Sequence, residues 1–367
     1  MAEIRVENLN KAFGEFIAVR GESFTIPDGS FFCLLGPSGC GKTTTLRMIA
    51  GLELPTSGRI LLGGEDVAFK RASERDIAFV FQLFALYPHM NVRRNIGFPL
   101  LCQGVPSSEI KARVEETAKL LRIDHLLDKS VSGLAGGDRQ RVALGRAIVR
   151  RPLAFLMDEP LGTLDTEFRD LMCEELRHLH DRIKATTVYV THDQLEAMSM
   201  ADKIAIMNNG RVEQLGSPQE IYDRPATLFV ADFIGSPSMN LIPVADRLAR
   251  GAGALSVSGA SIVIPEIRED APSEDLVLGA RPEHIRFDDA SGYRGEIFGT
   301  EYLGTMQIVT VKVPQGRVKV KVPASLHVTS GEQVGLAFLD DRLSLFDKGS
   351  GRVIRSALHD ARPTGGK

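Results

Sequence analysis

The sequence predicts an α/β domain with a mainly parallel sheet, followed by a smaller all-β domain. Three observations support this fold class. In the first part of the chain, short apolar runs alternate with amphipathic segments of helical period. A glycine-rich loop separates one apolar run from one helical segment, as at a turn from strand to helix. From residue 236 the helical patterns stop, and short segments of alternating apolar and polar residues follow, as in antiparallel sheets.

The predicted strands of the first part are separated by helices, as parallel strands require, because each connection must return to the same edge of the sheet. Ligands of such sheets bind beyond the carboxyl ends of the strands, so the residues after each strand form the candidate site. We predict strands at residues 30–35, 77–81, 154–157, 187–190 and 203–207, and helices at residues 109–121, 138–149 and 167–183.

The second part carries strand patterns that fit a small β-barrel or a sandwich, built as one β module or as two. A Pro-Gln-Gly turn at residues 314–316 joins two of these strands as a hairpin. We therefore expect domains at residues 1–235 and 236–355, and a loose tail at 356–367, which has little apolar surface to bury. The strand patterns lie at residues 260–264, 284–287, 307–313 and 317–322.

Size and composition exclude several classes of protein. A chain of 367 residues exceeds one ordinary core and suits two domains. Its net charge of −3, without a dense block of Lys and Arg, argues against a nucleic-acid partner. No apolar run approaches the roughly 18 residues of a membrane span, and the first residues do not resemble a signal peptide, so a membrane role requires a partner. The cysteines show no paired spacing and are expected to be free thiols in a reducing cytosol: Cys33, Cys40, Cys102 and Cys173.

Residues 36–43 match the phosphate-binding pattern G-x-x-x-x-G-K-[ST], between a predicted strand and a predicted helix. Glycine lets the backbone approach a polyphosphate, and the N–H groups at a helix N-terminus favour anions. Lys42 adds a charge for the β- and γ-phosphates, and Thr43 offers a hydroxyl to Mg²⁺. The candidate residues for binding a nucleoside triphosphate are Gly36, Pro37, Ser38, Gly39, Cys40, Gly41, Lys42, Thr43 and Thr44.

Two carboxylates follow the predicted strand at residues 154–157. Asp158 can hold Mg²⁺ through water, and Glu159 can take a proton from an attacking water molecule. In isolation the pair also fits an acidic loop after a buried strand. Beside a phosphate-binding loop, it predicts nucleotide hydrolysis.

Residues 134–138, Leu-Ala-Gly-Gly-Asp, precede a long amphipathic helix. This segment resembles the signature of the ABC-transporter ATPases, which most often reads Leu-Ser-Gly-Gly-Gln. The resemblance implies that ATP is bound between two subunits, with the signature of one facing the γ-phosphate held by the other. It also implies that residues 161–165 are the D-loop at the dimer interface. The residues expected to bind ATP across that interface are Ala135, Gly136, Gly137, Asp138 and Asp165.

The same resemblance assigns three further residues. Gln82 matches the glutamine that contacts Mg²⁺ or the attacking water, and residues 82–90 match the segment that touches the membrane subunit. His192 matches the switch histidine that bonds the γ-phosphate and orients the water. Phe13 matches an aromatic residue that stacks on adenine, although a phenylalanine in the core explains the sequence almost as well.

Residues 235–240 and 279–284 resemble segments of the maltose-type subclass, whose C-terminal regulatory domain is built of OB-like β modules. The resemblance covers nearly the whole chain. It implies the ATP-hydrolysing subunit of a bacterial ABC importer for a carbohydrate, polyol or sugar phosphate, peripheral on the cytoplasmic face of the inner membrane. The implied partners are two membrane-spanning permease subunits, a second ATPase subunit that is identical or paralogous, and an extracytoplasmic solute-binding protein.

Other functions remain as alternatives to this reading. An importer of a polyamine, ferric iron or an oxyanion is the alternative within the class. A soluble P-loop GTPase or kinase is disfavoured, because no Asn-Lys-x-Asp motif lies near a strand end. An ABC protein of DNA repair or translation is disfavoured, because the chain has neither long coiled-coil insertions nor a second cassette.

The signature departs from the common pattern at two positions. Ala135 lacks the hydroxyl of the usual serine, and one hydrogen bond to a charged group contributes roughly 1.5–3 kcal/mol. Asp138 replaces glutamine and would repel a phosphate unless Arg139 or Arg141 offsets its charge. Two arrangements are compatible with these changes. The chain forms a heterodimer with one strong and one weak ATP site, or a homodimer with two mildly slowed sites.

Overall fold

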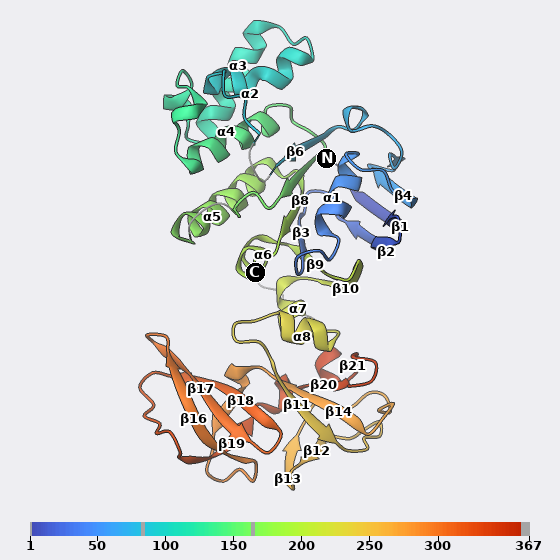
Figure 1. Cartoon of the computed structure of the whole chain (residues 1–367), viewed down its shortest axis with the longest axis vertical. Helices are drawn as coiled ribbons and strands as arrows, with labels where there is room; N and C mark the ends of the chain where they lie inside the picture. Colours follow the sequence, from blue (N-terminus) through green and yellow to red (C-terminus); the bar gives the residue numbers. More distant parts are fainter. Residues whose placement is uncertain (1, 82–84, 163–165, 361–367) are drawn as a thin grey trace. The chain divides into compact units, whose positions relative to one another are not determined.

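The computed structural model describes residues 2–81, 85–162 and 166–360, except for the side chains of Glu167 and Phe168. The chain forms two compact units, Met1–Pro218 and Gln219–Lys367 (Figure 1). The first unit is α/β and the second is built mainly of β-strands, which confirms the predicted fold class.

A six-stranded sheet forms the centre of the first unit. Its strands are β3 (Phe31–Leu35), β6 (Ile77–Val80), β7 (Ala154–Asp158), β8 (Thr186–Thr191), β9 (Lys203–Asn208) and β10 (Arg211–Gly216). They lie in the order β10-β9-β3-β8-β7-β6. All neighbours are parallel except β9 and β10, so the carboxyl ends of β3, β6, β7, β8 and β9 lie along one edge.

Different layers cover the two faces of this sheet, because alternate residues of a strand point to opposite sides. Phe32 and Leu34 of β3 belong to one buried cluster with Leu46 and Ile49 of α1 (Lys42–Ala50). The same cluster includes residues from three strands of an antiparallel sheet, β1 (Ile4–Phe13), β2 (Phe16–Ile26) and β4 (Ser57–Leu62). With the short β5 (Glu65–Asp66), that sheet has the order β2-β1-β4-β5. Phe31 faces the other way, 5.3 Å from the ring of His180 in α5 (Thr166–Ile183).

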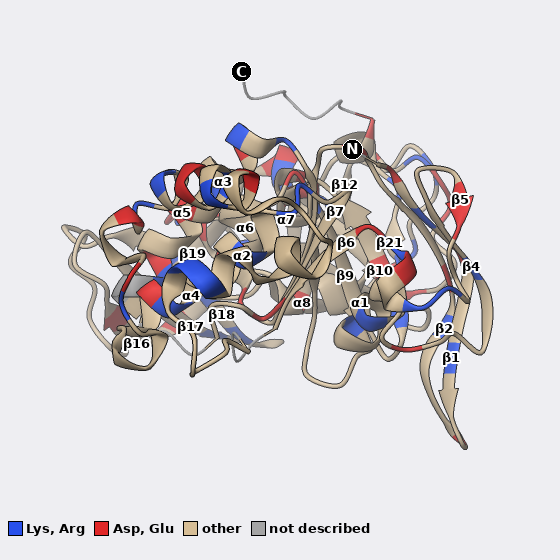
Figure 2. Ribbon diagram, turned by 90° about the horizontal axis from the view of Figure 1, so that it is seen from above, with Lys and Arg blue, Asp and Glu red and all other residues tan. Residues whose placement is uncertain are grey.

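Three helices form a separate part of the first unit between β6 and β7 (Figure 1). They are α2 (Val92–Cys102), α3 (Ser107–Leu120) and α4 (Gly136–Ile148), and both α2 and α3 contact α4. α4 contains three arginines, Arg139, Arg141 and Arg146. Much of this helix is therefore blue in Figure 2. α3, α4 and α5 lie where helices were predicted.

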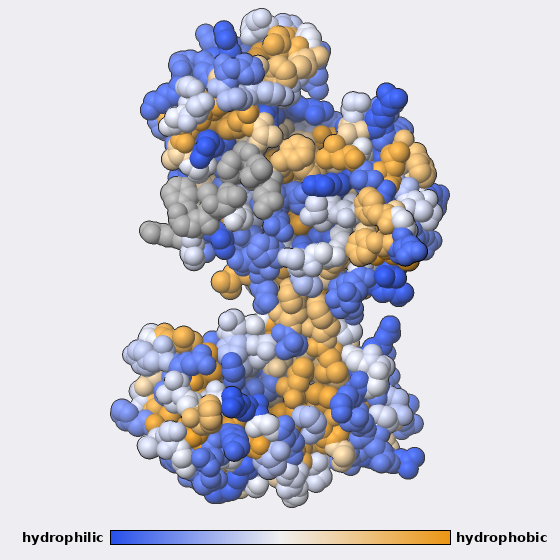
Figure 3. Space-filling model, in the orientation of Figure 1, coloured by the Kyte–Doolittle hydropathy of each residue, from blue (hydrophilic) through white to orange (hydrophobic). Residues whose placement is uncertain are grey.

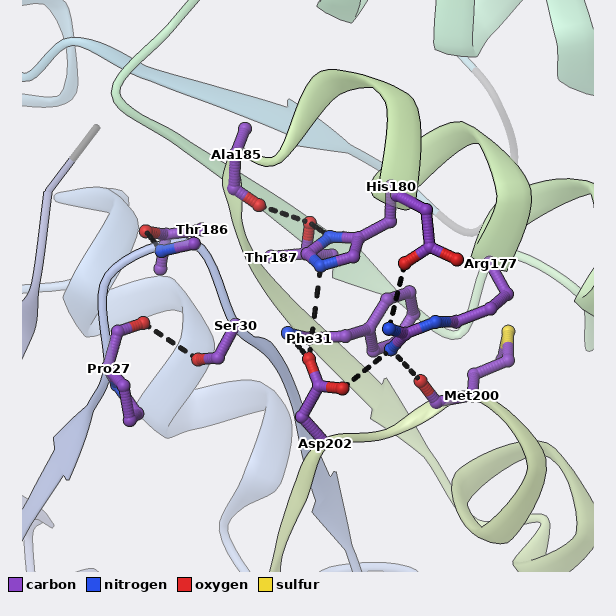
Figure 4. A network of polar contacts seen from close by, with 12 residues as sticks. Pro27, Ser30, Phe31, Arg177, His180, Ala185, Thr186, Thr187, Met200 and Asp202 are labelled. Carbon is purple, nitrogen blue, oxygen red and sulfur yellow. Dashed lines mark hydrogen bonds and ion pairs between the residues drawn. The ribbon is translucent and has the colours of Figure 1, made fainter. Parts of the chain in front are cut away.

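A polar network closes the end of the sheet where β3, β8 and β9 begin (Figure 4). The carboxylate of Asp202 accepts the backbone N–H of Phe31 at 2.8 Å and an N–H of Arg177 at 2.9 Å. His180 contributes Nδ1 to a 3.1 Å hydrogen bond with the Thr187 hydroxyl. This network joins α5 to three strand ends that lie opposite the predicted nucleotide edge.

The described residues of the second unit form three antiparallel sheets around a large buried apolar cluster, and a smaller cluster packs Ala231 of the segment 228–233 against Met239, Val277 and Phe346. The first sheet is β11-β14-β20-β21, with β11 (Asn240–Ala245), β14 (Asp275–Ala280), β20 (Ser344–Asp347) and β21 (Val353–Ile354). The second pairs β12 (Ala254–Val257) with β13 (Ala260–Val263). The third is β15-β19-β16-β17-β18, with β15 (Ile285–Phe287), β16 (Arg294–Tyr302), β17 (Met306–Val313), β18 (Gly316–Pro323) and β19 (Gln333–Phe338). Val313 pairs with Gly316, so the predicted hairpin at residues 314–316 is present.

Arg281 ties the start of the second unit to its sheets. Its side chain is 1% exposed, donates to the carbonyls of Ile234 and Tyr222, and lies 4.1 Å from the centre of the Tyr222 ring. Tyr222 is in α7 (Pro218–Asp223), and Ile234 follows α8 (Leu228–Phe233). The compact units therefore divide at residue 218, before the expected domain boundary at 235.

The C-terminal residues after β21 also join the second unit. Ala357 donates its N–H to the Glu266 carbonyl, and Ser356 is buried. The part of the expected tail at 356–360 is thus attached to the β unit, and residues 361–367 lie outside the described residues.

Candidate nucleotide site

The glycine-rich loop connects the end of β3 at Leu35 to the start of α1 at Lys42. Gly41 caps the helix with φ of 105°, a left-handed conformation that glycine adopts without steric cost. A Cβ atom at Gly41 would lie 2.5 Å from the Ala18 carbonyl oxygen. The loop therefore delivers the N-terminus of α1 to the carboxyl edge of the sheet, where a polyphosphate would meet its N–H groups.

Lys42 is buried within this loop. Its ammonium donates to the carbonyls of Gly36 at 2.7 Å and Pro37 at 3.0 Å. The cation is thus held at the centre of the loop by neutral acceptors that a phosphate oxygen can replace. Cys40 is also buried, and burial raises the pKa of its thiol despite the nearby ammonium, so it is not a reactive thiolate. Ser38 and Gly39 are exposed at the loop tip, and Thr44 is half-buried in the first turn of α1.

Thr43 and Asp158 meet at the same edge. The Thr43 hydroxyl donates to Oδ1 of Asp158 at 3.0 Å, and Arg47 of α1 lies 4.0 Å from Oδ2. Burial raises the pKa of Asp158, while the Thr43 hydrogen bond and the Arg47 charge act in the opposite direction.

The oxygen donors at this position suit Mg²⁺, which prefers hydroxyl, carboxylate, water and phosphate oxygens. Among the described residues, no group of three His, Cys, Asp or Glu side chains is placed to hold a metal ion. A cation at Thr43 and Asp158 would thus take most of its ligands from phosphate and water, as Mg²⁺ at nucleotide sites does.

Glu159 and His192 form a second pair at this edge. Nδ1 of His192 lies 3.3 Å from Oε1 of Glu159, and their side chains are 57% and 23% exposed. Glu159 has φ of 44°, an uncommon value for a residue with a side chain. Its N–H donates to the Val190 carbonyl at 3.0 Å, and its carbonyl accepts the N–H of Gly162 at 3.2 Å. These bonds fix an unusual backbone conformation at the residue predicted to act as general base.

The signature segment lies at the start of α4. Ala135 is exposed as the N-cap residue, Gly137 is buried, and Asp138 lies 3.9 Å from Arg141 one turn later. Figures 1 and 2 show α4 well away from α1. Within the described part of the chain, no hydrogen bond or ion pair joins residues 135–138 to residues 36–43. One subunit therefore does not bring these two predicted halves of an ATP site together.

Phe13 is exposed, which excludes the alternative that it is a core residue. Its side chain is 47% exposed at the end of β1, and the Lys11 ammonium lies 4.6 Å from its ring centre. Phe16 and Ile17 across the hairpin are exposed as well, and Figure 3 shows apolar residues at the surface in the region of β1 and β2. The hairpin thus presents an accessible aromatic face.

Two predicted site residues, Gln82 and Asp165, lie outside the described residues. The rest of the predicted membrane-facing segment, residues 85–90, is held by the buried Asn95 of α2. The Asn95 amide accepts the Tyr87 N–H at 2.9 Å and donates to the carbonyls of Tyr87 at 3.1 Å and Met90 at 3.2 Å. Pro88 and His89 are exposed on this segment.

Sequence reasoning missed several polar residues that support the site. Arg47 near Asp158, Asn95 beneath residues 85–90, and the pair Arg169 and Glu196 behind His192 were not predicted. For Asn95 and Glu196, a charged or amide residue at an expected core position was the available signal. Glu196, for instance, lies in the first turns of α6 (Gln194–Met200) and is only 4% exposed.

The fold and the loop define a nucleotide-binding protein of the P-loop class, with a carboxylate pair and a histidine at the same sheet edge. Comparison with protein families is more specific. Residues 19–162 match the ABC transporter model, residues 235–285 the MalK OB fold domain, and residues 278–346 the TOBE domain. With full-length relatives that are at least 42% identical, the chain belongs to the family of ABC transporter ATP-binding proteins with MalK-type C-terminal domains, and it is an ATPase.

Three relatives illustrate the similarity. The sn-glycerol-3-phosphate import ATP-binding protein UgpC of Cereibacter sphaeroides is 43% identical over 359 residues, covering 96% of this chain and 100% of that protein. The trehalose import ATP-binding protein SugC of Mycobacterium tuberculosis is 44% identical over 387 residues, covering 96% and 98%. The sulfoquinovosyl glycerol transport ATP-binding protein SmoE of Agrobacterium fabrum is 42% identical over 361 residues, covering 96% and 100%.

Solved structures support the fold of the ATPase part. The chain cbiO1 from Clostridium perfringens, part of the ABC transporter complex cbiONQ, matches with a TM-score of 0.57 and 28% identity over 60% of this chain and 90% of that chain. An ATP-binding cassette in its ADP conformation shares the fold, with a TM-score of 0.55 and 24% identity. Within the described residues, no helix combines the length and the apolar character needed to cross a membrane.

Proposed function

We propose that this ATPase energises a bacterial ABC importer for a carbohydrate, a polyol or a sugar phosphate, from the cytoplasmic face of the inner membrane. The relatives support this substrate class, because they are import ATP-binding proteins for sn-glycerol 3-phosphate, trehalose and trehalose/maltose. The C-terminal OB-like modules are of the type found in MalK.

The observation that carries the catalytic proposal is the convergence of two pairs beside the phosphate loop. Thr43 with Asp158, and Glu159 with His192, lie at the carboxyl edge of one parallel sheet. Lys42 and the backbone N–H groups of residues 38–44 bind the phosphates. Phe13 stacks on the adenine.

Mg²⁺ held by Thr43, Asp158 and Gln82 would neutralise charge on the β- and γ-phosphate oxygens. Within this site, Glu159 accepts a proton from the attacking water at Oε1 or Oε2, and His192 donates a hydrogen bond toward the γ-phosphate. Nδ1 of His192 lies 3.3 Å from Oε1 of Glu159, so both side chains can contact the same water molecule. Gln82 contacts that water or the metal ion.

The site is proposed to be completed by a second ATPase subunit. Ala135, Gly136, Gly137, Asp138 and Asp165 of one subunit would contact ATP on the other, since α4 and α1 lie apart within one chain. Closure of this dimer moves two permease subunits through residues 82–90, and a solute-binding protein supplies the substrate from outside. The altered signature is compatible with an identical or a paralogous partner. Counting copies of this chain in the purified transporter distinguishes them, because two copies in every complex exclude the paralogue.

The experiment that tests the catalytic proposal is Glu159→Gln. Glutamine keeps the size of the side chain but does not take a proton, so we expect hydrolysis to slow by roughly 10²–10⁴-fold. ATP affinity, measured with a fluorescent ATP analogue, should be retained because Lys42 and the loop are unchanged. Unchanged turnover in this variant would refute the assignment of Glu159.

The substrate proposal is tested with the reconstituted transporter. Maltose, trehalose and sn-glycerol 3-phosphate are compared with spermidine, ferric iron and sulfate, each with its matched binding protein. Stimulation of ATP hydrolysis by a sugar or a sugar phosphate supports the proposal. Stimulation only by a polyamine, iron or an oxyanion overturns it.

A further inference from the structure

The backbone around His192 is anchored on both sides, while the histidine side chain is exposed. Before it, the Thr191 hydroxyl donates to Oε2 of Glu196 at 2.7 Å and accepts the N–H of Asp193 at 2.9 Å. After it, Oδ1 of Asp193 caps α6 by accepting the N–H groups of Leu195 at 2.8 Å and Glu196 at 3.3 Å. His192 therefore projects from a turn whose two neighbours have little freedom.

Glu196 is the centre of this arrangement. Its carboxylate is buried, and the same oxygen that accepts the Thr191 hydroxyl also accepts the Tyr189 hydroxyl at 2.8 Å. Burial raises the pKa of Glu196, and the two hydroxyl donors act against that rise. A buried carboxylate is costly unless it is partnered, and an apolar residue could fill the same space. The carboxylate at position 196 is therefore explained by its hydrogen bonds and not by the space that it fills.

Arg169 connects this group to a third element. From the first turn of α5, its guanidinium contacts Oδ2 of Asp193 at 3.1 Å and lies 3.7 Å from Oε1 of Glu196. The other oxygen of Glu196 binds the hydroxyls, so the carboxylate joins β8 on one side and α5 on the other. α5 begins directly after residues 161–165, the segment that resembles the D-loop.

We propose that Glu196 is a positioning residue that, with Arg169 and Asp193, fixes the turn carrying His192 relative to Glu159. This inference rests on the proposed role of His192. Glu196 is too deeply buried to touch the nucleotide itself. It acts by holding Thr191 and Asp193, so that the His192 ring stays 3.3 Å from the carboxylate of Glu159. A misplacement of about 1 Å at a reacting group can slow a reaction about 10²-fold.

Glu196→Gln keeps the contacts of one carboxylate oxygen and changes those of the other. The amide oxygen can still accept both hydroxyls, but the amide N–H₂ then faces the Arg169 guanidinium, donor against donor. We expect kcat for ATP hydrolysis to fall by about 10-fold or more, with KM and the affinity for a fluorescent ATP analogue within about twofold of the wild type. Glu174→Gln is the matched control, because this carboxylate is exposed on α5 and should leave kcat unchanged.

A double-mutant cycle with His192→Ala distinguishes positioning from a general structural role. If Glu196 acts through His192, adding Glu196→Gln to His192→Ala causes no further loss of kcat, whereas independent effects multiply. The inference is overturned if Glu196→Gln lowers kcat by the same factor in the His192→Ala variant as in the wild type. It is also overturned if folded Glu196→Gln has the kcat of the wild type. Wild-type kcat in His192→Ala alone refutes the proposed role of His192 and, with it, the inference.

Tyr189→Phe provides the same test if Glu196→Gln does not fold. It removes one hydroxyl donor from the carboxylate and preserves the shape of a fully buried ring. The expected outcome is a lower kcat with unchanged ATP affinity, and again no additional loss on top of His192→Ala. An additive loss in this cycle contradicts the inference.

Discussion

At the scale of single residues, two glycines of the phosphate-binding loop, Gly36 and Gly41, leave no room for a side chain. A Cβ atom at Gly36 would lie 2.2 Å from the carbonyl oxygen of Met207 in β9 and 2.8 Å from Sγ of Cys40. The first glycine is therefore required by close packing against β9, in addition to any need for backbone approach to phosphate. Glycine at position 41 combines a left-handed φ with a close approach to β2.

Replacement of Gly36 by alanine should disturb both the fold and the site. The new methyl group meets a backbone carbonyl that cannot move alone, so we expect a loss of about 1–3 kcal/mol in the free energy of unfolding. Affinity for an ATP analogue should fall as well, because the loop shifts away from α1. Urea unfolding and analogue titration measure the two effects.

Gly133→Ala is the control for this substitution. A Cβ at Gly133 meets nothing within 4 Å, so stability and nucleotide affinity should stay close to wild type. Equal behaviour of the two alanine variants would show that the contact with Met207 is not what requires glycine at position 36.

At the scale of single elements, the start of α4 lacks an N-cap side chain. Ala135 has φ of −60° and ψ of 160°, the extended conformation that N-cap residues adopt, but a methyl group accepts no hydrogen bond. Asp138 in the first turn supplies a negative charge at this end of the helix, contributing about 0.3–1 kcal/mol. The departure from the usual signature therefore alters the helix as well as the proposed contact with phosphate.

Ala135→Ser should stabilise α4 and strengthen the ATP site formed with the partner subunit. A serine hydroxyl at the N-cap accepts an N–H in the first turn, which adds about 0.5–2 kcal/mol to the free energy of unfolding. In the assembled transporter, the same hydroxyl should raise the rate of hydrolysis. Urea unfolding of the chain and the ATPase rate of the complex are the measurements.

Ala135→Val tests whether the hydroxyl is responsible. Valine enlarges the side chain without adding an acceptor, so it should not stabilise α4 or raise the ATPase rate. If serine stabilises the chain but leaves the rate of the complex unchanged, the proposed contact of position 135 with ATP is wrong.

At the scale of the whole molecule, the first unit carries a buried histidine, His180, and the second carries two half-buried ones, His284 and His359. Burial lowers the pKa of His180 in the first unit, and of His284 and His359 in the second. Below the ordinary histidine pKa of about 6.5, the unfolded chain binds protons that these residues resist in the folded state. Their contribution to stability is therefore present above pH 6.5 and is lost as the pH falls below it.

His180→Asn isolates this effect in the first unit. Burial raises the pKa of the half-buried Glu22 and of the buried Glu196, which makes stability change with pH in the opposite direction, so the wild type must be compared with a histidine variant. The wild type should lose more stability than His180→Asn between pH 7.5 and 5.5, measured by urea unfolding. A loss of equal size in both proteins would contradict the assignment.

Much of the fold was predictable because its signals are local. The glycine loop stands between a five-residue apolar strand and a helix, so residues 36–43 predicted the turn at β3 and α1. The change near residue 236, from helical patterns to alternating apolar and polar residues, predicted the β unit. The helix α2 gave a weaker signal, because Pro99 and the buried Asn95 interrupt its apolar pattern.

The sequence by itself determined the family, the alternation of the predicted strands with helices, and the residues that follow those strands, because motif spacing and periodicity are properties of neighbouring residues. Only the tertiary structure decided which of these ends meet. The burial of Glu196 and the exposure of Phe13 are results of packing in the folded chain. The contacts of Thr43 with Asp158 and of Glu159 with His192 arise from the strand order, in which β3, β8 and β7 are neighbours. These residues lie far apart in the chain, and pairing between distant segments depends on global packing that local patterns do not encode.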